Sequence, residues 1–292
     1  MGVKIPNLRL IGPVAGAAAV GAALLLIPQA PAFGESTGAP PAQATAASPQ
    51  DTPTSPQPIP PERPVKFYPV DSTFLAYYNQ VDGPRVMGGA ISPRTTSGGA
   101  TAQYFEKARL EDHRATNRTG NPTYDFEYGL LVDEMKAIRS LAPIGGERST
   151  VTYDALQTAS DPSQRVAPPP GFTGNVVVGA NNTFIPFSAD LSPAAGHNVP
   201  PYFWAYMNRA DLFPAGWLHD IGLPITEPIP ATVDKGRFLP DLQRFTNVPI
   251  VIQAFQRTIL TYDPANPAGY EVERANTGTD YSRLFPQNVP NP

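Results

Sequence analysis

Two stretches decide the fold: Gln103-Tyr104-Phe105-Glu106-Lys107-Ala108-Arg109-Leu110 and Gln253-Ala254-Phe255-Gln256-Arg257-Thr258-Ile259-Leu260. They share Gln, Phe and Leu at matching positions, with a basic residue at the fifth position of each. Apolar residues alternate through the second stretch from residue 250 onward, which is typical of a strand. Both stretches therefore predict strands, and their similarity predicts an internal duplication.

Three further landmarks recur in the same order. Residues 72–79 (STFLAYYN) match 201–208 (PYFWAYMN), residues 88–92 match 222–226, and residues 124–127 match 270–273. The first pair predicts a short aromatic helix, because its large side chains are spaced three and four apart. The offset between the copies changes only between landmarks, as expected when insertions fall in loops.

Each copy therefore predicts a short helix, a glycine turn, a long strand and a returning strand. After the first copy, Leu131, Met135, Ile138 and Leu141 predict an amphipathic helix. Between the copies, residues 175–178 and 184–187 flank Gly179-Ala180-Asn181-Asn182-Thr183, which predicts a hairpin. Since an isolated hairpin is marginally stable, these parts should pack together. The expected fold is α+β and loop-rich, with antiparallel strands and two related helix plus β-hairpin units packed into one body.

Composition excludes several classes of protein. The chain has 292 residues with 37 Pro and 24 Gly, which disfavours coiled coils and parallel sheets. The net charge of −4 lacks the basic surface that binding to a phosphate backbone requires, so no nucleic acid partner is expected. Without Cys there are no disulfides, and stability must come from the core.

The N-terminal region predicts export. Residues 1–34 have the form of a signal peptide, with Lys4 and Arg9 before an apolar run and Ala30-Pro31-Ala32 as a cleavage site. The apolar run from Val14 to Ile27 is short for a membrane-spanning helix. A cleaved signal is the favoured interpretation, with no membrane span afterwards and an extracellular or cell-surface location; retention as an anchor is the alternative.

Composition also divides the rest of the chain. Residues 35–64 contain 9 Pro and no aromatic residue, which predicts a disordered linker. The predicted folded part comprises a first repeat unit at 65–142, a connecting hairpin segment at 143–195 and a second repeat unit at 196–292.

The second copy carries the order aromatic helix, Gly-Leu-Pro-Ile-Thr at 222–226 and Gln-x-Phe-x-Arg-x-x-Leu-x-Tyr at 253–262. This order resembles a secreted, uncharacterised bacterial repeat family, and is distantly similar to LGFP repeats, which are cell-wall-associated modules. The resemblance covers about residues 67–135 and 196–285. The first copy departs from it at Met87-Gly88-Gly89-Ala90, where Leu and Pro are missing. The resemblance implies residence near the cell envelope and brings no active site.

No catalytic or metal-binding motif stands out. The only histidines are His113, His197 and His219, without zinc-ligand spacing, so no metal and no cofactor are expected. His219-Asp220 could form an oriented imidazole, but no nucleophile elbow accompanies it and a turn is favoured. Carboxylates beside the strand landmarks are the candidates for a hydrolase with acids dispersed in the sequence. These are Glu106, Glu111, Glu127 and Glu273.

Aromatic residues give the candidate binding site. Sugars stack on aromatic rings and hydrogen-bond to nearby polar groups. The candidates are Trp204, Tyr206, Trp217, Asn208, Arg209 and Asp220. The alternative is that the aromatic side chains of this helix form the core between the copies.

The leading hypothesis is a secreted or surface-tethered, non-catalytic module that binds a cell-envelope or extracellular polysaccharide, or a surface protein. One alternative is a glycan or peptide hydrolase that uses dispersed carboxylates. Another is a structural subunit of an extracellular assembly.

Overall fold

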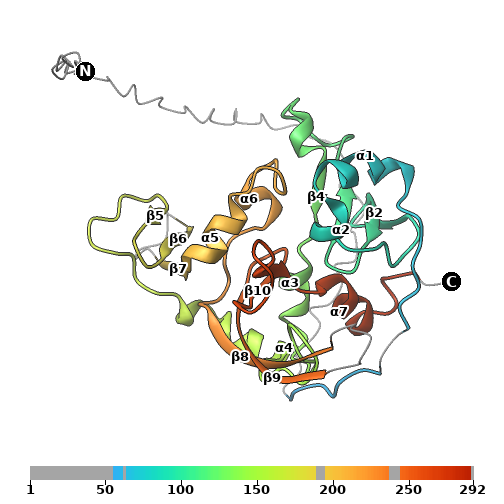
Figure 1. Cartoon of the computed structure of the whole chain (residues 1–292). Coiled ribbons are helices and arrows are strands. Elements are labelled where there is room, and N and C mark those ends of the chain that lie inside the picture. The colour runs from blue at the N-terminus through green and yellow to red at the C-terminus, as the bar shows by residue number, and fades with distance from the viewer. Residues whose placement is uncertain (1–54, 62–63, 189–194, 237–243, 291–292) are drawn as a thin grey trace, which may run out of the picture. The chain divides into compact units, whose positions relative to one another are not determined.

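The computed structural model describes residues 55–61, 64–188, 195–236 and 244–290. The predicted signal peptide at 1–34 and most of the predicted linker at 35–64 lie outside these residues. All described residues belong to one compact unit. The described part of the chain contains seven α-helices and three antiparallel sheets, so the predicted α+β class is confirmed (Figure 1).

The first half of this unit extends from α1 to α3. It begins with helices α1 (Ser72–Gln80) and α2 (Gly83–Val86) and ends with α3 (Leu131–Met135). Between them lies a four-stranded meander in the order β1-β2-β3-β4. The strands are β1 (Thr95–Ser97), β2 (Ala100–Tyr104), β3 (Arg109–Asp112) and β4 (Phe126–Tyr128), with a 3-10 turn at Pro122–Tyr124.

The second half, from α5 to α7, repeats this order. Helices α5 (Pro201–Met207) and α6 (Trp217–Asp220) come first, and α7 (Thr277–Leu284) comes last. The meander between them is β8-β9-β10-β11. Its strands are β8 (Ile229–Gly236), β9 (Arg244–Ala254), β10 (Ile259–Tyr262) and β11 (Val272–Arg274). The two halves thus correspond element by element.

The prediction of one long strand in each half is wrong, because the structure has a two-stranded hairpin there. The chain reverses where Phe105 N–H donates to the carbonyl of Ala108, and again where Phe255 N–H donates to Thr258. Neither reversal has a residue with positive φ, so the glycine or asparagine that signals most two-residue turns is missing. The turn residues Glu106-Lys107 and Gln256-Arg257 include no glycine, asparagine or proline, so the sequence predicts one uninterrupted strand at each hairpin.

A buried glutamine ties each sheet to the chain before its first helix. Gln103 Nε2 donates to the carbonyls of Pro69 and Ser92, and its Oε1 accepts from Asp71 N–H at 2.9 Å. Gln253 Nε2 makes the matching bonds to Asn198 and Thr226. The residue that matches Asp71 is Pro200, which has no N–H, and Gln253 Oε1 is buried without a partner among the described residues.

This difference predicts a stabilising substitution. Pro200→Asp supplies the missing N–H to Gln253 Oε1 and a carboxylate to cap α5, as Asp71 caps α1. Satisfying a buried acceptor and adding a cap should outweigh the lost rigidity of proline, so the free energy of unfolding should rise by about 1 kcal/mol. Urea unfolding of the two proteins measures the change. In a Gln253→Leu background the same substitution should give a smaller gain, and an equal gain there would contradict the argument.

The segment between the halves differs from its prediction in extent. The predicted hairpin forms from β5 (Val177–Val178) and β6 (Thr183–Ser188), and β7 (Ala195–Val199) adds an unpredicted third strand. Helix α4 (Tyr153–Ala159) and a 3-10 turn at Pro162–Gln164 precede them. The amphipathic helix predicted from Leu131 to Leu141 ends at Met135, because the chain turns there and reaches a positive φ at Arg139.

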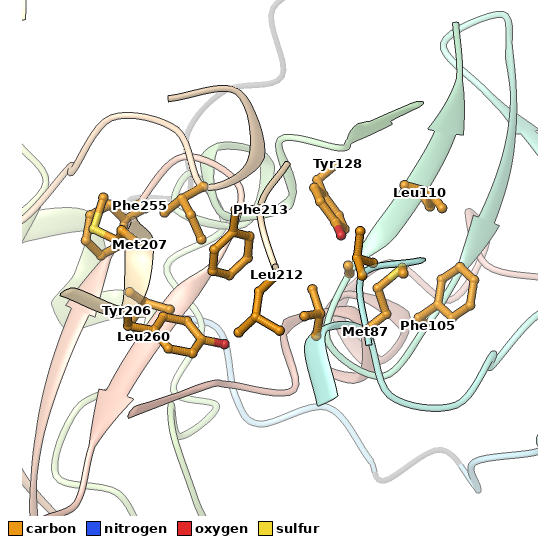
Figure 2. Packing of buried hydrophobic residues seen from close by; sticks show 14 of the residues in the cluster. Met87, Phe105, Leu110, Tyr128, Tyr206, Met207, Leu212, Phe213, Phe255 and Leu260 are labelled. Atoms are coloured by element: carbon orange, nitrogen blue, oxygen red, sulfur yellow. The ribbon is translucent and has the colours of Figure 1, made fainter. Parts of the chain in front are cut away.

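The main hydrophobic cluster is shared by both halves. Phe74 and Tyr77 of α1 are buried in the same cluster as their counterparts Phe203 and Tyr206 of α5. Figure 2 shows side chains of the first half (Met87, Phe105, Leu110, Tyr128) and of the second half (Tyr206, Met207, Leu212, Phe213, Phe255, Leu260) in this cluster. Burying equivalent side chains in one core joins the two halves into one body.

The last helix of each half also contacts the opposite half. In α3, Asp133 N–H donates to the carbonyl of Gln256, and in α7, Thr279 N–H donates to the carbonyl of Glu106. These are matching atoms in the two halves, so the contact is reciprocal. Each half therefore completes the other.

No helix within the described ranges combines the length and apolarity needed to cross a membrane.

Candidate functional site

The aromatic candidates form a pair. Trp204 and Trp217 are half-buried, with their rings edge to face at 5.7 Å and 61°. Tyr206 belongs to the core, as the core alternative predicted. The structure thus leaves two of the three aromatic candidates accessible for ring contacts.

The polar candidates do not converge on that pair. Arg209 binds Asp211 with Nη2 and Oδ2 2.5 Å apart, and Asn208 Nδ2 donates to the Trp204 carbonyl. Asp220 is fully buried and accepts from Ala215 N–H. Because Tyr206 and Asp220 are buried, the six predicted residues do not all lie on one accessible surface.

A polar groove lies elsewhere, on one face of the first sheet. It has a volume of about 610 Å³ and is bounded by β1, β2, β3, α3, α7 and the segment after α7. Its lining residues are Thr95, Thr96, Ser97, Gly98, Ala100, Tyr104, Arg109, Glu111, His113, Glu134, Tyr281, Gln287, Asn288 and Pro290.

Arg109 organises the floor of this groove. Its Nε lies 2.6 Å from Glu111 Oε1, and its Nη2 lies 2.8 Å from Glu134 Oε1. Burial of the guanidinium opposes its charge, but the hydrogen bonds that it donates to Glu134 and the negative charge of Glu111 outweigh that effect and raise the pKa of Arg109. Two carboxylates from β3 and α3 are therefore held in place by one buried cation.

Hydroxyl and amide groups extend the network along α7. Tyr281 OH donates to Glu134 Oε2 at 2.6 Å and accepts from Asn288 Nδ2 at 3.1 Å. Burial, followed by the hydrogen bond to Glu134, raises the pKa of Tyr281. The ring of Tyr281 stacks on Tyr104 at 5.7 Å, so its position is fixed by packing as well.

A second hollow adjoins the groove. It has a volume of about 500 Å³ and shares Gly98, Ala100 and His113 with the first. His113 Nε2 lies 3.0 Å from Glu111 Oε2, which connects the two hollows through one side chain. Arg114 forms a bidentate ion pair with Asp112 at the edge of the second hollow. The two hollows therefore meet at His113, Gly98 and Ala100.

The equivalent face of the second sheet is closed. Ile259 and Thr261 occupy the places of Arg109 and Glu111. Ile144 and Val151 belong to the same buried cluster as Ile250, Ile252 and Ile259. Gly145 lies so close to this face that an added side chain would meet Ile252, Ile250 and Thr261. The first sheet therefore presents an open polar face where the second has an apolar one covered by the connecting segment.

The remaining predicted carboxylates lie outside the groove. Glu106 Oε2 accepts a hydrogen bond from Gly89 N–H of the glycine turn, and Glu273 Oε2 accepts one from Asn266 Nδ2. Glu127 on β4 is directly opposite Glu111 on β3 and faces His219 and Arg257. Among the described residues no group of His, Asp and Glu could hold a metal ion.

The groove residues were named in the sequence only in part. Glu111 and His113 were singled out, but Arg109, Glu134 and Tyr281 were missed. A comparison of the two copies contained a signal: Arg109 and Glu111 are charged where Ile259 and Thr261 are not. A charged pair at positions that are uncharged in the other copy indicates a surface with a different use.

Comparisons with known proteins found no matching family model, no matching curated protein and no matching solved structure. The resemblance to LGFP repeats therefore rests on the quoted motifs alone.

Proposed function

We propose that this protein is a secreted or surface-tethered, non-catalytic module that binds a cell-envelope or extracellular polysaccharide in the groove on its first sheet. The observation that carries the proposal is the difference between the halves. One sheet face is apolar and covered by the chain itself, while the matching face is polar and open. A concavity of this size in which several polar groups converge is a candidate place for a ligand.

The groove suits a ligand rich in hydroxyl groups. Hydroxyls both donate and accept hydrogen bonds, and the lining offers carboxylate acceptors, amide groups and side-chain hydroxyls. The rings of Tyr104 and Tyr281 are almost fully buried, so they support the floor and offer little apolar surface to a ligand. An apolar ligand would leave the polar groups of the groove unpaired, which is costly.

The Arg109 ion pairs support a binding role over a catalytic one. Both groove carboxylates already accept hydrogen bonds from the guanidinium. A general acid or base needs a proton it can exchange with the substrate, and a strong ion pair opposes that exchange.

Binding of purified envelope glycan fragments to the full chain, measured by calorimetry, tests the proposal. His113→Ala removes a lining side chain and should weaken binding about tenfold. Trp204→Ala is the matched control, because it alters the originally predicted aromatic surface, and it should leave affinity unchanged. Loss of binding in Trp204→Ala with retention in His113→Ala would transfer the site to the tryptophan pair. Absence of binding to any fraction by the folded protein would refute the proposal.

One observation keeps hydrolysis as a second candidate. Glu111 and Glu127 are register partners on adjacent strands, so their side chains leave the same face of the sheet. Hydrolases use carboxylate pairs on either side of a scissile bond. Release of reducing ends that is abolished by Glu111→Gln would favour this candidate, whereas binding without turnover favours the module. The assembly-subunit alternative predicts self-association, which light scattering measures.

A further inference from the structure

A histidine lies at a charged contact between the two halves. His219 in α6 belongs to the second half, and its imidazole is mostly buried against β4 of the first half, with 14% of the side chain exposed. Nδ1 lies 2.8 Å from Oδ1 of the fully buried Asp220. The ring of Tyr124 packs edge to face against the imidazole at 5.1 Å. One ring nitrogen therefore has a strong partner within its own helix.

The other nitrogen lacks a hydrogen bond. Nε2 is buried and has no such partner in the part of the chain that the structure describes. Its nearest charged neighbour is Glu127 Oε1, at 3.7 Å, whose other oxygen lies 3.7 Å from Arg257 Nη2. A neutral imidazole that donates through Nδ1 to Asp220 presents a lone pair at Nε2, and a lone pair facing a carboxylate is unfavourable. Protonation converts that nitrogen into a donor aimed at Glu127.

The equivalent contact between the halves, made by α2 of the first half, has an arginine in place of this histidine. In the first half, Arg85 of α2 corresponds to His219. The two short helices align through the residues that follow, because Val86 N–H donates to the carbonyl of Asp82 and Asp220 N–H donates to the carbonyl of Gly216. The guanidinium of Arg85 lies 4.6 Å from the ring of Tyr270, which corresponds to Tyr124. The same contact between halves is thus made once with arginine, which stays charged, and once with histidine, whose charge depends on pH.

We propose that proton uptake at Nε2 of His219 completes a charged bridge from Asp220 through the imidazolium to Glu127, and that this bridge strengthens the contact between the halves. The charged and titratable groups that face the ring are Asp220 from its own helix, Glu127 and Tyr124 from the β4 region, and Arg257 from the β9–β10 turn. Arg257 already neutralises part of the Glu127 charge, and Asp220 supplies the second anion. The proposal concerns the two halves and does not depend on the ligand.

A double-mutant cycle on the full chain tests the bridge. The free energy of unfolding is measured for wild type, His219→Gln, Glu127→Gln and the double variant at about pH 8 and about pH 5.5. The coupling between the two positions should increase by a factor of about three to ten in the unfolding equilibrium constant on acidification. A cycle of Arg85→Gln with Tyr270→Leu is the matched control and should show the same coupling at both pH values. Equal or weaker coupling of His219 with Glu127 at acidic pH would overturn the proposal.

Nitrogen NMR of the wild-type imidazole provides a test that needs no variant to fold. The proposal expects the neutral ring to carry its proton on Nδ1 and a second proton to appear on Nε2 as the pH falls. A neutral ring protonated on Nε2 would overturn it.

Discussion

Gly278→Ala is expected to destabilise the protein by about 3 kcal/mol or more. Gly278 lies in the first turn of α7, where a Cβ atom would overlap the carbonyl oxygen of Phe105 and crowd Ala108. Both obstacles are backbone atoms of the first half, so neither can rotate away. The substitution should therefore force α7 off the turn at residues 105–108 and expose the buried face that the helix covers. Urea unfolding monitored by tryptophan fluorescence measures the loss.

Thr279→Ala is the control for this prediction. It lies next to Gly278 and its N–H makes the contact to Glu106, but alanine keeps that N–H and favours the helix. Its stability should stay within about 0.5 kcal/mol of wild type. Equal stability of Gly278→Ala and Thr279→Ala would show that α7 does not pack closely on the opposite half.

Asp280→Asn is expected to stabilise the protein at neutral pH. Burial raises the pKa of Asp280 to about 6, although Tyr153 OH and Arg283 both favour its ionised form. The native state thus binds the proton of Asp280 more tightly than the unfolded state does. The stability that the protonated carboxyl contributes is therefore complete at a pH below the ordinary pKa of aspartate, and it is lost as the pH rises through about 6. The asparagine still accepts from Tyr153 and carries no charge. The gain should be about 2 kcal/mol at about pH 7.5 and close to zero at about pH 4.

The first half supplies a matched control for that prediction. Glu134 is the counterpart of Asp280, but it is ion-paired with Arg109 and exposed on one side. Glu134→Gln removes an anion from a buried cation, so it should destabilise the protein at neutral pH. The two substitutions should therefore change the unfolding free energy in opposite directions. A loss of stability in Asp280→Asn at neutral pH would contradict the raised pKa of this carboxyl.

Much of the fold follows from local patterns that occur twice. Phe74 and Phe203, and Phe105 and Phe255, were matched in the sequence and lie in one core. Matching was possible because helix spacing and strand alternation persist where side chains face a shared interior. The hairpins at 105–108 and 255–258 escaped detection because their turns use Glu106-Lys107 and Gln256-Arg257, which carry no turn signal.

The missing leucine of the first copy has a spatial explanation. Leu223 has Gly89 as its counterpart, and a Cβ at Gly89 would meet the ring of Phe67. Phe67 precedes the first matched landmark at residues 72–79, so a comparison of the landmarks alone gives no reason to place it there. The tertiary structure, and not the repeated pattern, shows that Phe67 occupies the space beside Gly89.

The groove was harder to predict than the fold for a similar reason. It depends on which sheet face the connecting segment covers, and that choice depends on packing of Ile144 and Val151 against the second sheet. The tryptophans attracted attention because sugars stack on aromatic rings, yet Trp204 and Trp217 contact the core and each other. The aromatic residue type suggested sugar binding at the tryptophans, whereas the open face of the first sheet has the space for a ligand.

Backbone amide NMR of the full chain, titrated with a glycan fraction that the protein retains, tests the central claim most directly. If the open face of the first sheet binds the ligand, the largest shift changes occur in β1, β3 and the residues after α7, including Asn288, while Trp204 and Trp217 are unaffected. Changes confined to the tryptophan pair, or to the covered face of the second sheet, would contradict the account.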